Sequence, residues 1–303
     1  MEMLITGGAG FIGSHLAACM TNLGHSVILC DLPGKLSQHL LDTYDTIECD
    51  VSEASQVNQL PCVDVIYHLA AQVGTVGSMK DVYKDFSWNA CGTLNIAQFA
   101  RDTCVEVFVY ASSMAVYGQA SYATETYPTV PLSPYGISKM CGELYVKYAQ
   151  SKSHKMQCVT FRIFNCYGPG QPTRNLTQGL ASIFLEQVKT GNTIDVTGDL
   201  TRHRDLIYID DVISALKLPL DDNEMRGTFN LCSGEKTSIQ SLVDLIIKVS
   251  KKESNNFTVT NIGGIPEDPH DSCGDNSKLR KLGWNITVPL ETGLKICWDR
   301  INE

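Results

Sequence analysis

The sequence LITGGAGFIG, at positions 4–13, decides the fold of this 303-residue chain. An apolar run at positions 3–6 leads into it and predicts a strand. The apolar spacing of residues 11–23 predicts a helix directly after it. Three glycines at three-residue spacing fill the turn between the two elements. A strand, a glycine turn and a helix in this order open a βαβ unit, so the stretch indicates an α/β protein with a parallel sheet.

The same alternation continues through the first half of the chain. Helical patterns lie at positions 82–101 and 135–151. Short apolar or β-branched runs predict further strands at 26–30, 46–49, 63–69, 105–111 and 159–164. Strands that alternate with helices predict a doubly wound, Rossmann-type parallel sheet with helices on both faces.

The residue composition of the sequence changes after residue 165. Residues 167–174 are rich in Gly and Pro and predict a loop, and the polar stretch 263–276 predicts a loop over a site. The regular elements predicted there are helices at 180–190 and 238–250 and a strand at 206–209. We expect a first domain at residues 1–165, to which segments around 204–235 return, and a smaller α/β substrate-binding domain at 166–303.

The composition argues against several classes of function. The chain has 24 Lys+Arg against 33 Asp+Glu, a formal net charge of −9, whereas nucleic acid and anionic membranes require positive surfaces. We therefore expect no nucleic-acid or membrane partner. No apolar run approaches the roughly 20 residues of a membrane helix. The first strand begins at position 3, so we expect no signal peptide. Twelve scattered cysteines favour reduced thiols in a cytoplasmic protein, and no spacing suggests a metal site.

The glycine turn indicates a dinucleotide site. Side chains at Gly7, Gly10 and Gly13 would keep a pyrophosphate away from the backbone N–H groups and the helix N-terminus. Asp31 ends the second strand about 20 residues further on, where a carboxylate hydrogen-bonds the adenosine ribose and repels a 2′-phosphate. The pattern therefore favours NAD over NADP, although Lys35 lies close by.

Tyr135 and Lys139 are candidate catalytic residues. Their i, i+4 spacing places them on one face of the predicted helix. A tyrosine beside an ammonium group and a positively charged nicotinamide is expected to have a lowered pKa and to act as a general base. Ser113 follows the fifth strand and Asn165 the sixth, and ligands bind at strand ends in open α/β sheets.

Together these motifs resemble the extended short-chain dehydrogenase/reductase family, in its NAD-dependent sugar-nucleotide epimerase/dehydratase group. The resemblance extends over nearly the whole chain, from position 3 to about 284. It rests further on His68-Leu69-Ala70-Ala71-Gln72, Asn89 with Gly92-Thr93, Val116-Tyr117-Gly118, Arg162, Tyr167-Gly168-Pro169-Gly170, Arg204-Asp205, Asp210-Asp211-Val212, Asp275, Ser277-Lys278 and Leu282-Gly283-Trp284.

The resemblance implies a role for each matched residue. Tyr135 takes the proton of a sugar hydroxyl while a hydride leaves the same carbon for NAD, Lys139 tunes Tyr135 and holds the nicotinamide ribose, and Ser113 binds the reacting oxygen. The expected NAD contacts are Gly7, Gly10, Phe11, Ile12, Gly13, Asp31, Asp50, Val51, Leu69, Ala70, Ala71, Asn89, Tyr135, Lys139 and Phe164. The expected substrate contacts are Ser113, Asn165, Gln178, Arg204 and Ser272, with Arg204 on a phosphate.

The two residues after Ser113 bear on the reaction. Dehydratases that resemble this chain carry an Asp-Glu pair there, decarboxylases carry a Glu at the second position, and reductive epimerases carry a Cys at the second position. This chain has Met114-Ala115, neither of which can transfer a proton. A 4-epimerase needs no further acid or base, so we expect epimerisation of a nucleotide sugar at C4 through a 4-keto intermediate. The alternatives are a net dehydrogenase or 4-keto-reductase and, more remotely, a non-catalytic NAD-binding module.

Two positions near the C-terminus bear on the substrate. Ser272 aligns with a gatekeeper whose small size implies tolerance of N-acetylhexosamines. Ile265 stands where the family has an arginine that anchors a phosphate, so Arg174 or Arg202 is a candidate substitute, or the substrate is not an ordinary UDP-sugar. By the same resemblance, the helices at 82–101 and 135–151 imply a homodimer, and the supply of polysaccharide precursors is the implied pathway.

Overall fold

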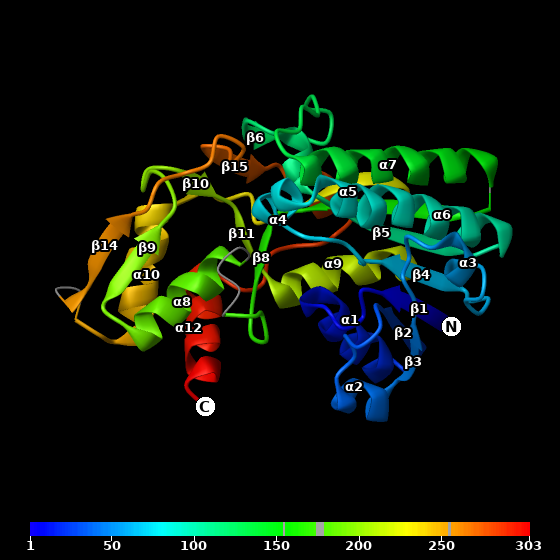
Figure 1. Ribbon diagram of the computed structural model, residues 1–303, viewed down its shortest axis with the longest axis horizontal. Coiled ribbons are helices and arrows are strands. Elements are labelled where there is room, and N and C mark those ends of the chain that lie inside the picture. The colour runs from blue at the N-terminus through cyan, green and yellow to red at the C-terminus, as the bar shows by residue number, and fades with distance from the viewer. Residues whose placement is uncertain (154, 174–178, 254–255) are drawn as a thin grey trace. The chain divides into compact units, whose positions relative to one another are not determined.

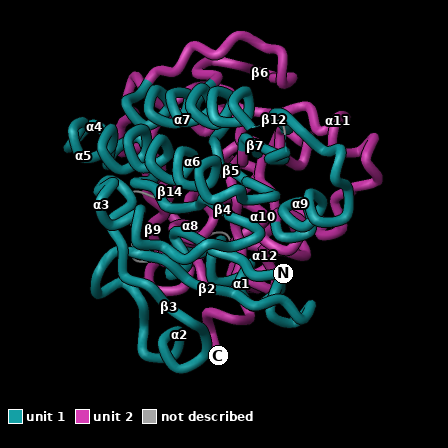
Figure 2. Tube along the Cα trace, turned by 90° about the vertical axis from the view of Figure 1, so that its right-hand side faces the viewer, with its two compact units in different colours: residues 1–116, 133–162, 213–229 teal, residues 117–132, 163–212, 230–303 magenta. Residues whose placement is uncertain are grey.

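The computed structural model describes residues 1–303 except 154, 174–178 and 254–255 (Figure 1). The described chain divides into two compact units, each assembled from separate stretches of sequence (Figure 2). Unit 1 comprises residues 1–116, 133–162 and 213–229. Unit 2 comprises residues 117–132, 163–212 and 230–303.

A seven-stranded sheet forms the centre of unit 1 in the described chain. Its strands, in spatial order, are β12 (Gly227–Leu231), β7 (Gln157–Ile163), β5 (Val107–Ser113), β4 (Val65–His68), β1 (Glu2–Thr6), β2 (Ser26–Asp31) and β3 (Asp45–Glu48). The pairings from β3 through β2, β1 and β4 to β5 are parallel. Because the chain winds from β1 to β2 and β3 and then returns to β4, the strand order reverses between β1 and β4. Open α/β sheets bind ligands beyond the strand ends at such a point.

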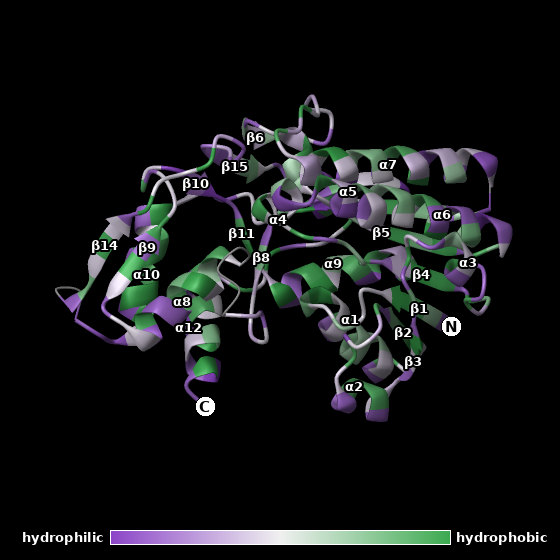
Figure 3. Cartoon of the chain, in the orientation of Figure 1, coloured by the Kyte–Doolittle hydropathy of each residue, from purple (hydrophilic) through white to green (hydrophobic). Residues whose placement is uncertain are grey.

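Helices of unit 1 pack on this sheet, with α1 against β1 and β2, α6 against β4 and α7 against β5. They are α1 (Phe11–Asn22), α2 (Gln38–Thr43), α3 (Ala54–Val57), α4 (Thr75–Lys80), α5 (Val82–Asp85), the π-helix η1 (Phe86–Cys91), α6 (Gly92–Asp102), α7 (Pro134–Lys152) and most of α9 (Ile209–Asp221). The strands β4 and β5 are buried along their whole length, as strands covered on both faces must be. Figure 3 shows the apolar character of β1, β2 and β4.

Unit 2 has three small sheets among its described residues. The four-stranded sheet has the order β13 (Thr237–Ser238), β10 (His203–Arg204), β15 (Asp271–Gly274) and β6 (Ala120–Ala123), and the two-stranded sheets join β11 (Leu206–Tyr208) to β8 (Asn165–Tyr167) and β14 (Thr258–Asn261) to β9 (Thr193–Val196). Its helices include α8 (Leu180–Thr190), α10 (Ile239–Ser250), α11 (Ser277–Arg280) and α12 (Leu290–Ile301). No helix in the described ranges of either unit is long and apolar enough to cross a membrane.

Three sequence predictions about the elements are corrected. The single helix predicted at 82–101 is α5, η1 and α6, because an extra residue per turn is accommodated at η1. The loop predicted at 263–276 contains β15, whose backbone pairs with β10 and β6. The loop predicted from 167 begins one residue later, since Tyr167 pairs with Tyr208 at the end of β8.

The division into units also differs from the predicted boundaries. Residues 117–132 belong to unit 2, because β6 pairs with β15 rather than with the large sheet. The segment that returns to unit 1 is 213–229, which is shorter than the predicted 204–235 and consists mainly of α9 and the start of β12. Both differences depend on pairing between strands that are far apart in the sequence, which local sequence patterns do not reveal.

Candidate active site

The glycine turn between β1 and α1 is shaped by close backbone contacts. Gly7 has φ +71°, and a Cβ there would come within 2.7 Å of the Ala70 backbone nitrogen. A Cβ on Gly13 would run into the Gly7 carbonyl oxygen. Gly10 donates its backbone N–H to that same carbonyl at 3.0 Å. The turn therefore presents bare backbone at the N-terminus of a 12-residue helix, a cradle that suits a diphosphate.

Asp31 closes β2 beside this turn. Its Oδ2 accepts a hydrogen bond from the Ala9 N–H at 2.9 Å, and its Oδ1 accepts from the Leu32 N–H at 2.8 Å. The half-buried carboxylate is thus fixed against the glycine turn, where an adenosine ribose fits. These residues suit the adenosine and diphosphate of NAD.

Most of the other predicted cofactor residues of unit 1 lie at the carboxyl ends of neighbouring strands or at the start of α1. Thr6 Oγ1 accepts a hydrogen bond from the Ala70 N–H at 3.3 Å, which ties the end of β4 to the end of β1. Asp50, after β3, accepts from the Ser52 N–H and hydroxyl, and Val51 is buried against Gly92. Phe11, Ile12, Leu69 and Ala71 are half-buried.

Ser113, Tyr135 and Lys139 come together in unit 1. Ser113 ends β5, and the other two residues lie on the buried face of α7, whose N-terminus is capped by Ser133. Lys139 Nζ donates to the Ala111 carbonyl at 2.8 Å and lies 5.1 Å from the centre of the Tyr110 ring. Burial lowers the pKa of Lys139 to about 8, while Asp85 and Glu143 raise it.

The acidity of Tyr135 differs from the sequence prediction. Burial raises the pKa of Tyr135 to about 12, and a hydrogen bond with Ser113 lowers it in part. The predicted lowering relied on two positive charges. In the protein chain itself the cost of burying a phenolate is larger than the benefit of the hydrogen bond with Ser113.

A buried ion pair adjoins the group formed by Ser113, Tyr135 and Lys139. Arg162 donates to both carboxylate oxygens of Glu143, at 2.8 and 2.7 Å, and the Ser112 hydroxyl donates to Glu143 Oε1 at 2.6 Å. Glu143 is one helical turn after Lys139, and Ser112 directly precedes Ser113. Sequence reasoning listed Arg162 in a motif but gave Glu143 no role. An i, i+4 pair of Lys and Glu on a helix is too common to attract attention.

Asn89, a predicted NAD contact, is fully buried within η1. Its side-chain nitrogen donates to Asp85 Oδ1 at 2.9 Å, to Ser138 Oγ at 3.1 Å and to the Gln72 carbonyl at 3.0 Å. Its Oδ1 accepts from the Gln72 N–H at 2.8 Å. In the protein itself this side chain therefore connects three segments of unit 1.

The predicted substrate residues other than Ser113 belong to unit 2. Arg204 on β10 is opposite Ser272 on β15 in a parallel pair, and both are buried. Asn165 donates its side-chain N–H to the Asp205 carbonyl at 2.8 Å. Phe164 packs its ring 6.4 Å from that of Tyr117 and against the backbone of Gly274, where a Cβ would come within 2.6 Å. Gln178 lies outside the described residues.

Two residues surround Arg204: Asp268, to which the sequence gave no role, and Arg202, one of the two predicted substitutes for the missing phosphate-binding arginine. Asp268 accepts from Arg204 Nη2 at 2.7 Å, and its other oxygen is paired with Arg202. Arg202 also donates to the carbonyls of Asp199 and Thr197. Two buried guanidinium groups therefore share the Asp268 carboxylate. The signal in the sequence was the repeated arginine in Arg202-His203-Arg204.

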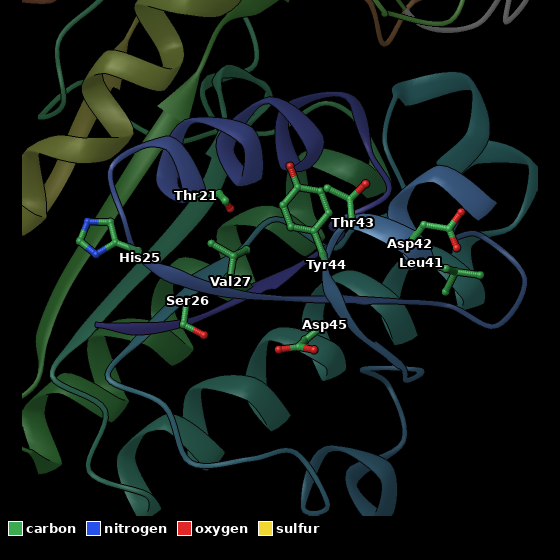
Figure 4. A pocket seen from close by; sticks show the side chains of 9 residues that line it. All are labelled: Thr21, His25, Ser26, Val27, Leu41, Asp42, Thr43, Tyr44 and Asp45. Atoms are coloured by element: carbon green, nitrogen blue, oxygen red, sulfur yellow. The ribbon is translucent and has the colours of Figure 1, made fainter.

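A polar hollow at the other edge of the large sheet is distinct from these residues (Figure 4). It lies between the end of α1 and the first residues of β2 and β3, and Thr21, Ser26 and Asp45 are among the residues that line it. These are the amino ends of parallel strands, whereas Asp31 and Ser113 lie at carboxyl ends. No predicted site residue lines this hollow. The described residues also contain no cluster of three or more His, Cys, Asp or Glu side chains suited to a metal ion.

The fold and the site of unit 1 define an NAD-dependent enzyme with a Ser, Tyr and Lys set at the carboxyl edge of a Rossmann-type sheet. The family model for the NAD dependent epimerase/dehydratase family matches residues 3–232, and the chain belongs to this family. The family and the cofactor predicted from the sequence are thereby confirmed.

Relatives match over the full length of the chain. A UDP-glucose 4-epimerase of Mycolicibacterium smegmatis is 32% identical over 307 residues, which cover 97% of this chain and 96% of that protein. A putative UDP-glucose 4-epimerase of Methanocaldococcus jannaschii is 30% identical over 310 residues, 99% of each chain. The crystal structure of the Thermus thermophilus UDP-glucose 4-epimerase complex with NAD has a TM-score of 0.90 at 29% identity, and the match covers 100% of this chain and 99% of that chain.

Proposed function

We propose that this protein epimerises a nucleotide-diphosphate sugar at C4 through a transient 4-keto intermediate. The observation that carries the proposal is the convergence of Ser113, Tyr135 and Lys139 beside η2, the 3₁₀ helix Met114–Tyr117. The residues after Ser113 are Met114 and Ala115, so this strand end offers no acid or base for elimination of water. The similarity to UDP-glucose 4-epimerases supports the same reaction.

The residues of unit 1 fit the two halves of this reaction. NAD, when bound, would supply the acceptor for the C4 hydride and would return it to the opposite face of the 4-keto intermediate. Tyr135 removes the proton of the 4-hydroxyl as the C4–H bond breaks, and later returns that proton to the carbonyl oxygen. Ser113 hydrogen-bonds the sugar oxygen at C4, on which negative charge develops during the reaction. Lys139 stabilises the phenolate of Tyr135 by its positive charge, which offsets part of the cost of burial.

Backbone and carboxylate groups are proposed to hold the cofactor. The bare turn from Gly7 to Gly13 and the N-terminus of α1 would hold the diphosphate, and Asp31 would hold the adenosine ribose. Asp31 also disfavours a 2′-phosphate, because two negative groups would then be brought together.

Arg204 and Arg202 are proposed to hold the diphosphate of the substrate. Ile265 stands where the resemblance implies a phosphate-binding arginine. In its place Arg202, which shares Asp268 with Arg204, would provide the second positive charge. A phosphate that pairs with Arg204 would compete with Asp268 for the same guanidinium group. Arg204→Gln is expected to raise the KM for the nucleotide sugar much more than it lowers kcat, and an unchanged KM would contradict this assignment.

The reaction is tested by incubating the purified protein with UDP-glucose or UDP-N-acetylglucosamine without added cofactor. The anomeric protons are followed by NMR. A galacto-configured product would establish 4-epimerisation with retained NAD. Turnover that needs added NAD and releases NADH would instead establish a net dehydrogenase.

The variant Tyr135→Phe tests the mechanism. The variant lacks only the phenolic oxygen, so NAD is expected to stay bound while turnover falls by about 10²- to 10⁴-fold. Unchanged turnover would rule out Tyr135 as the base and with it the proposed mechanism.

We further propose that the protein is a homodimer through α5, η1 and α7. The buried face of α7 carries Tyr135, Lys139 and Glu143, whereas apolar side chains face outward. The exposed apolar residues of these three helices are Val82, Tyr83, Phe86, Ile137, Leu144, Tyr145 and Tyr148. Tyr83 is 90% exposed and Leu144 is 58% exposed, which favours a second copy as the occupant of this face.

Light scattering tests the dimer. The wild-type protein is expected to have twice the chain mass, and Leu144→Glu is expected to be monomeric at the same concentration. Val130→Glu is the control, because Val130 is equally exposed but lies in unit 2. A monomeric wild-type protein would contradict the proposal.

The twelve free thiols support a reducing compartment, for which we propose the cytoplasm.

A further inference from the structure

Asp85 is a buried carboxylate to which the mechanism above gives no role. It is the last residue of α5, directly before η1, and is 1% exposed. Its Oδ1 accepts from Asn89 at 2.9 Å, but its Oδ2 has no hydrogen-bond partner among the described residues. A carboxylate buried in this way is costly to keep charged unless a positive group lies close by.

The π-helix connects Asp85 to the catalytic helix. Asn89 lies within η1, and its single side-chain nitrogen is shared between Asp85 and Ser138. Ser138 is the residue before Lys139 on α7. π-Helices are rare and are found frequently at functional sites. A continuous hydrogen-bonded path thus leads from the buried carboxylate to the residue next to Lys139.

Several titratable groups surround Lys139, and most of them are either neutral or already paired with another group. Glu143 on α7 is paired with both Arg162 and Ser112. His68 on β4 is neutral, because burial and the charge of Lys139 lower its pKa to about 3.

The remaining groups around Lys139 do not supply a negative charge either. Tyr110 on β5 is a protonated phenol, since burial raises its pKa well above the usual range. The nearest other elements, α4 and α6, carry Lys80, Arg101 and Asp102, none of which is buried. Among these described groups, Asp85 is the buried carboxylate with an oxygen that has no hydrogen-bond partner, and its charge favours the ammonium form of Lys139.

We propose that Asp85 is a positioning residue for the Tyr135–Lys139 pair: its carboxylate keeps Lys139 protonated and fixes Asn89 against Ser138 of α7. The proposal rests on the proposed function only in assigning a reaction to that pair. Asp85 acts on both members of the pair in the same direction. It raises the pKa of Lys139 by favouring the ammonium form, and it raises the pKa of Tyr135 by disfavouring the phenolate.

The test is the pH dependence of kcat/KM in Asp85→Asn, an isosteric change that still allows the bond to Asn89. Activity needs Tyr135 ionised and Lys139 protonated, so removal of the charge is expected to move both limbs of the pH profile to lower pH. Asp81→Asn is the control, because it makes the same charge change at an exposed position four residues earlier. A profile that only loses height, with both limbs unmoved, would show a merely structural role and overturn the proposal.

A second measurement does not depend on activity. The side-chain nitrogen of Lys139 is titrated by NMR in ¹⁵N-lysine-labelled protein, and its signal is assigned by its loss in Lys139→Met. The midpoint is expected at lower pH in Asp85→Asn than in the wild-type protein and in Asp81→Asn. Equal midpoints would overturn the proposal even if the protein proved to be a dehydrogenase. If neither Asp85→Asn nor Asp85→Ser folds, Asp85 serves helix packing and the proposal is also overturned.

Discussion

Arg204 and Ser272 lie opposite each other in the parallel pairing of β10 with β15. Paired residues on neighbouring strands point to the same face of a sheet, so a guanidinium group and a small hydroxyl side chain share one face in unit 2. Ser272 is 4% exposed, and its Oγ has no hydrogen-bond partner among the described residues. The residue proposed to bind phosphate and the residue proposed to read the sugar are thus direct neighbours.

This pairing leads to a prediction about substrate size. Ser272→Tyr is expected to lower kcat/KM for UDP-N-acetylglucosamine relative to UDP-glucose by about 10- to 200-fold, because an aromatic ring would take the space of the acetamido group. Ser272→Ala keeps the small side chain and should leave the ratio unchanged. Equal loss on both sugars in Ser272→Tyr would argue that the position affects packing instead of selection.

The preference for NAD is predicted to depend on Asp31. Asp31→Asn keeps an acceptor for the Ala9 N–H but removes the charge. A hydrogen bond to a charged group contributes about 1.5–3 kcal/mol, so the affinity for NAD is expected to fall by about 10- to 100-fold, and NADP should bind relatively better. Calorimetric titration of cofactor-free protein measures both. Asp42→Asn, an exposed change on α2, should bind NAD as the wild type does.

The fold was largely predictable from local sequence because its first half is built from short parallel units. The strand at 26–30 and the helix at 135–151 are found within one or two residues of β2 and α7. The residues near them carry strong local signals, namely glycine at a positive φ and proline at the first turn of a helix. Such signals act over a few residues and are therefore legible in a single sequence.

The parts that escaped prediction depend on partners far away in the chain. Asp268 is 64 residues from Arg204, and β6 pairs with β15 across about 150 residues. Asp85 was missed for a different reason, since the π-helix shifts it out of the register that a regular helix of 82–101 would give. A carboxylate in an apparently ordinary amphipathic helix gives no sign that it is buried.

His68 is predicted to make stability depend on pH. Burial and Lys139 lower its pKa to about 3 in the folded protein, against 6.5 in the unfolded chain. Above pH 6.5 it is neutral in both states and has no effect. Below pH 6.5 only the unfolded state takes up the proton, so stability is lost as the pH falls, by about 2 kcal/mol between pH 6.5 and pH 5.

Urea unfolding at pH 7 and pH 5 measures this effect, with His68→Asn as the comparison. The variant is expected to be less stable at pH 7, because its shorter side chain cannot bond both Thr6 and Thr93 as the imidazole does. Its loss of stability between the two pH values should be smaller than that of the wild type. A wild-type protein that is equally stable at both values would show that His68 is protonated in the folded state.

The ion pair of Arg162 and Glu143 is predicted to be needed as a pair. Both side chains are about 95% buried, so Arg162→Met leaves a buried carboxylate without its cation and is expected to cost about 3–5 kcal/mol of unfolding free energy. Glu143→Gln should cost a similar amount for the opposite reason. The double variant removes both charges and is expected to be more stable than either single variant, since the penalty lies in the unpaired charge. Lys295→Met breaks an exposed pair with Asp299 and should cost at most about 0.5 kcal/mol. Additive losses in the double variant, measured by urea unfolding, would instead mean that each residue acts through its own packing.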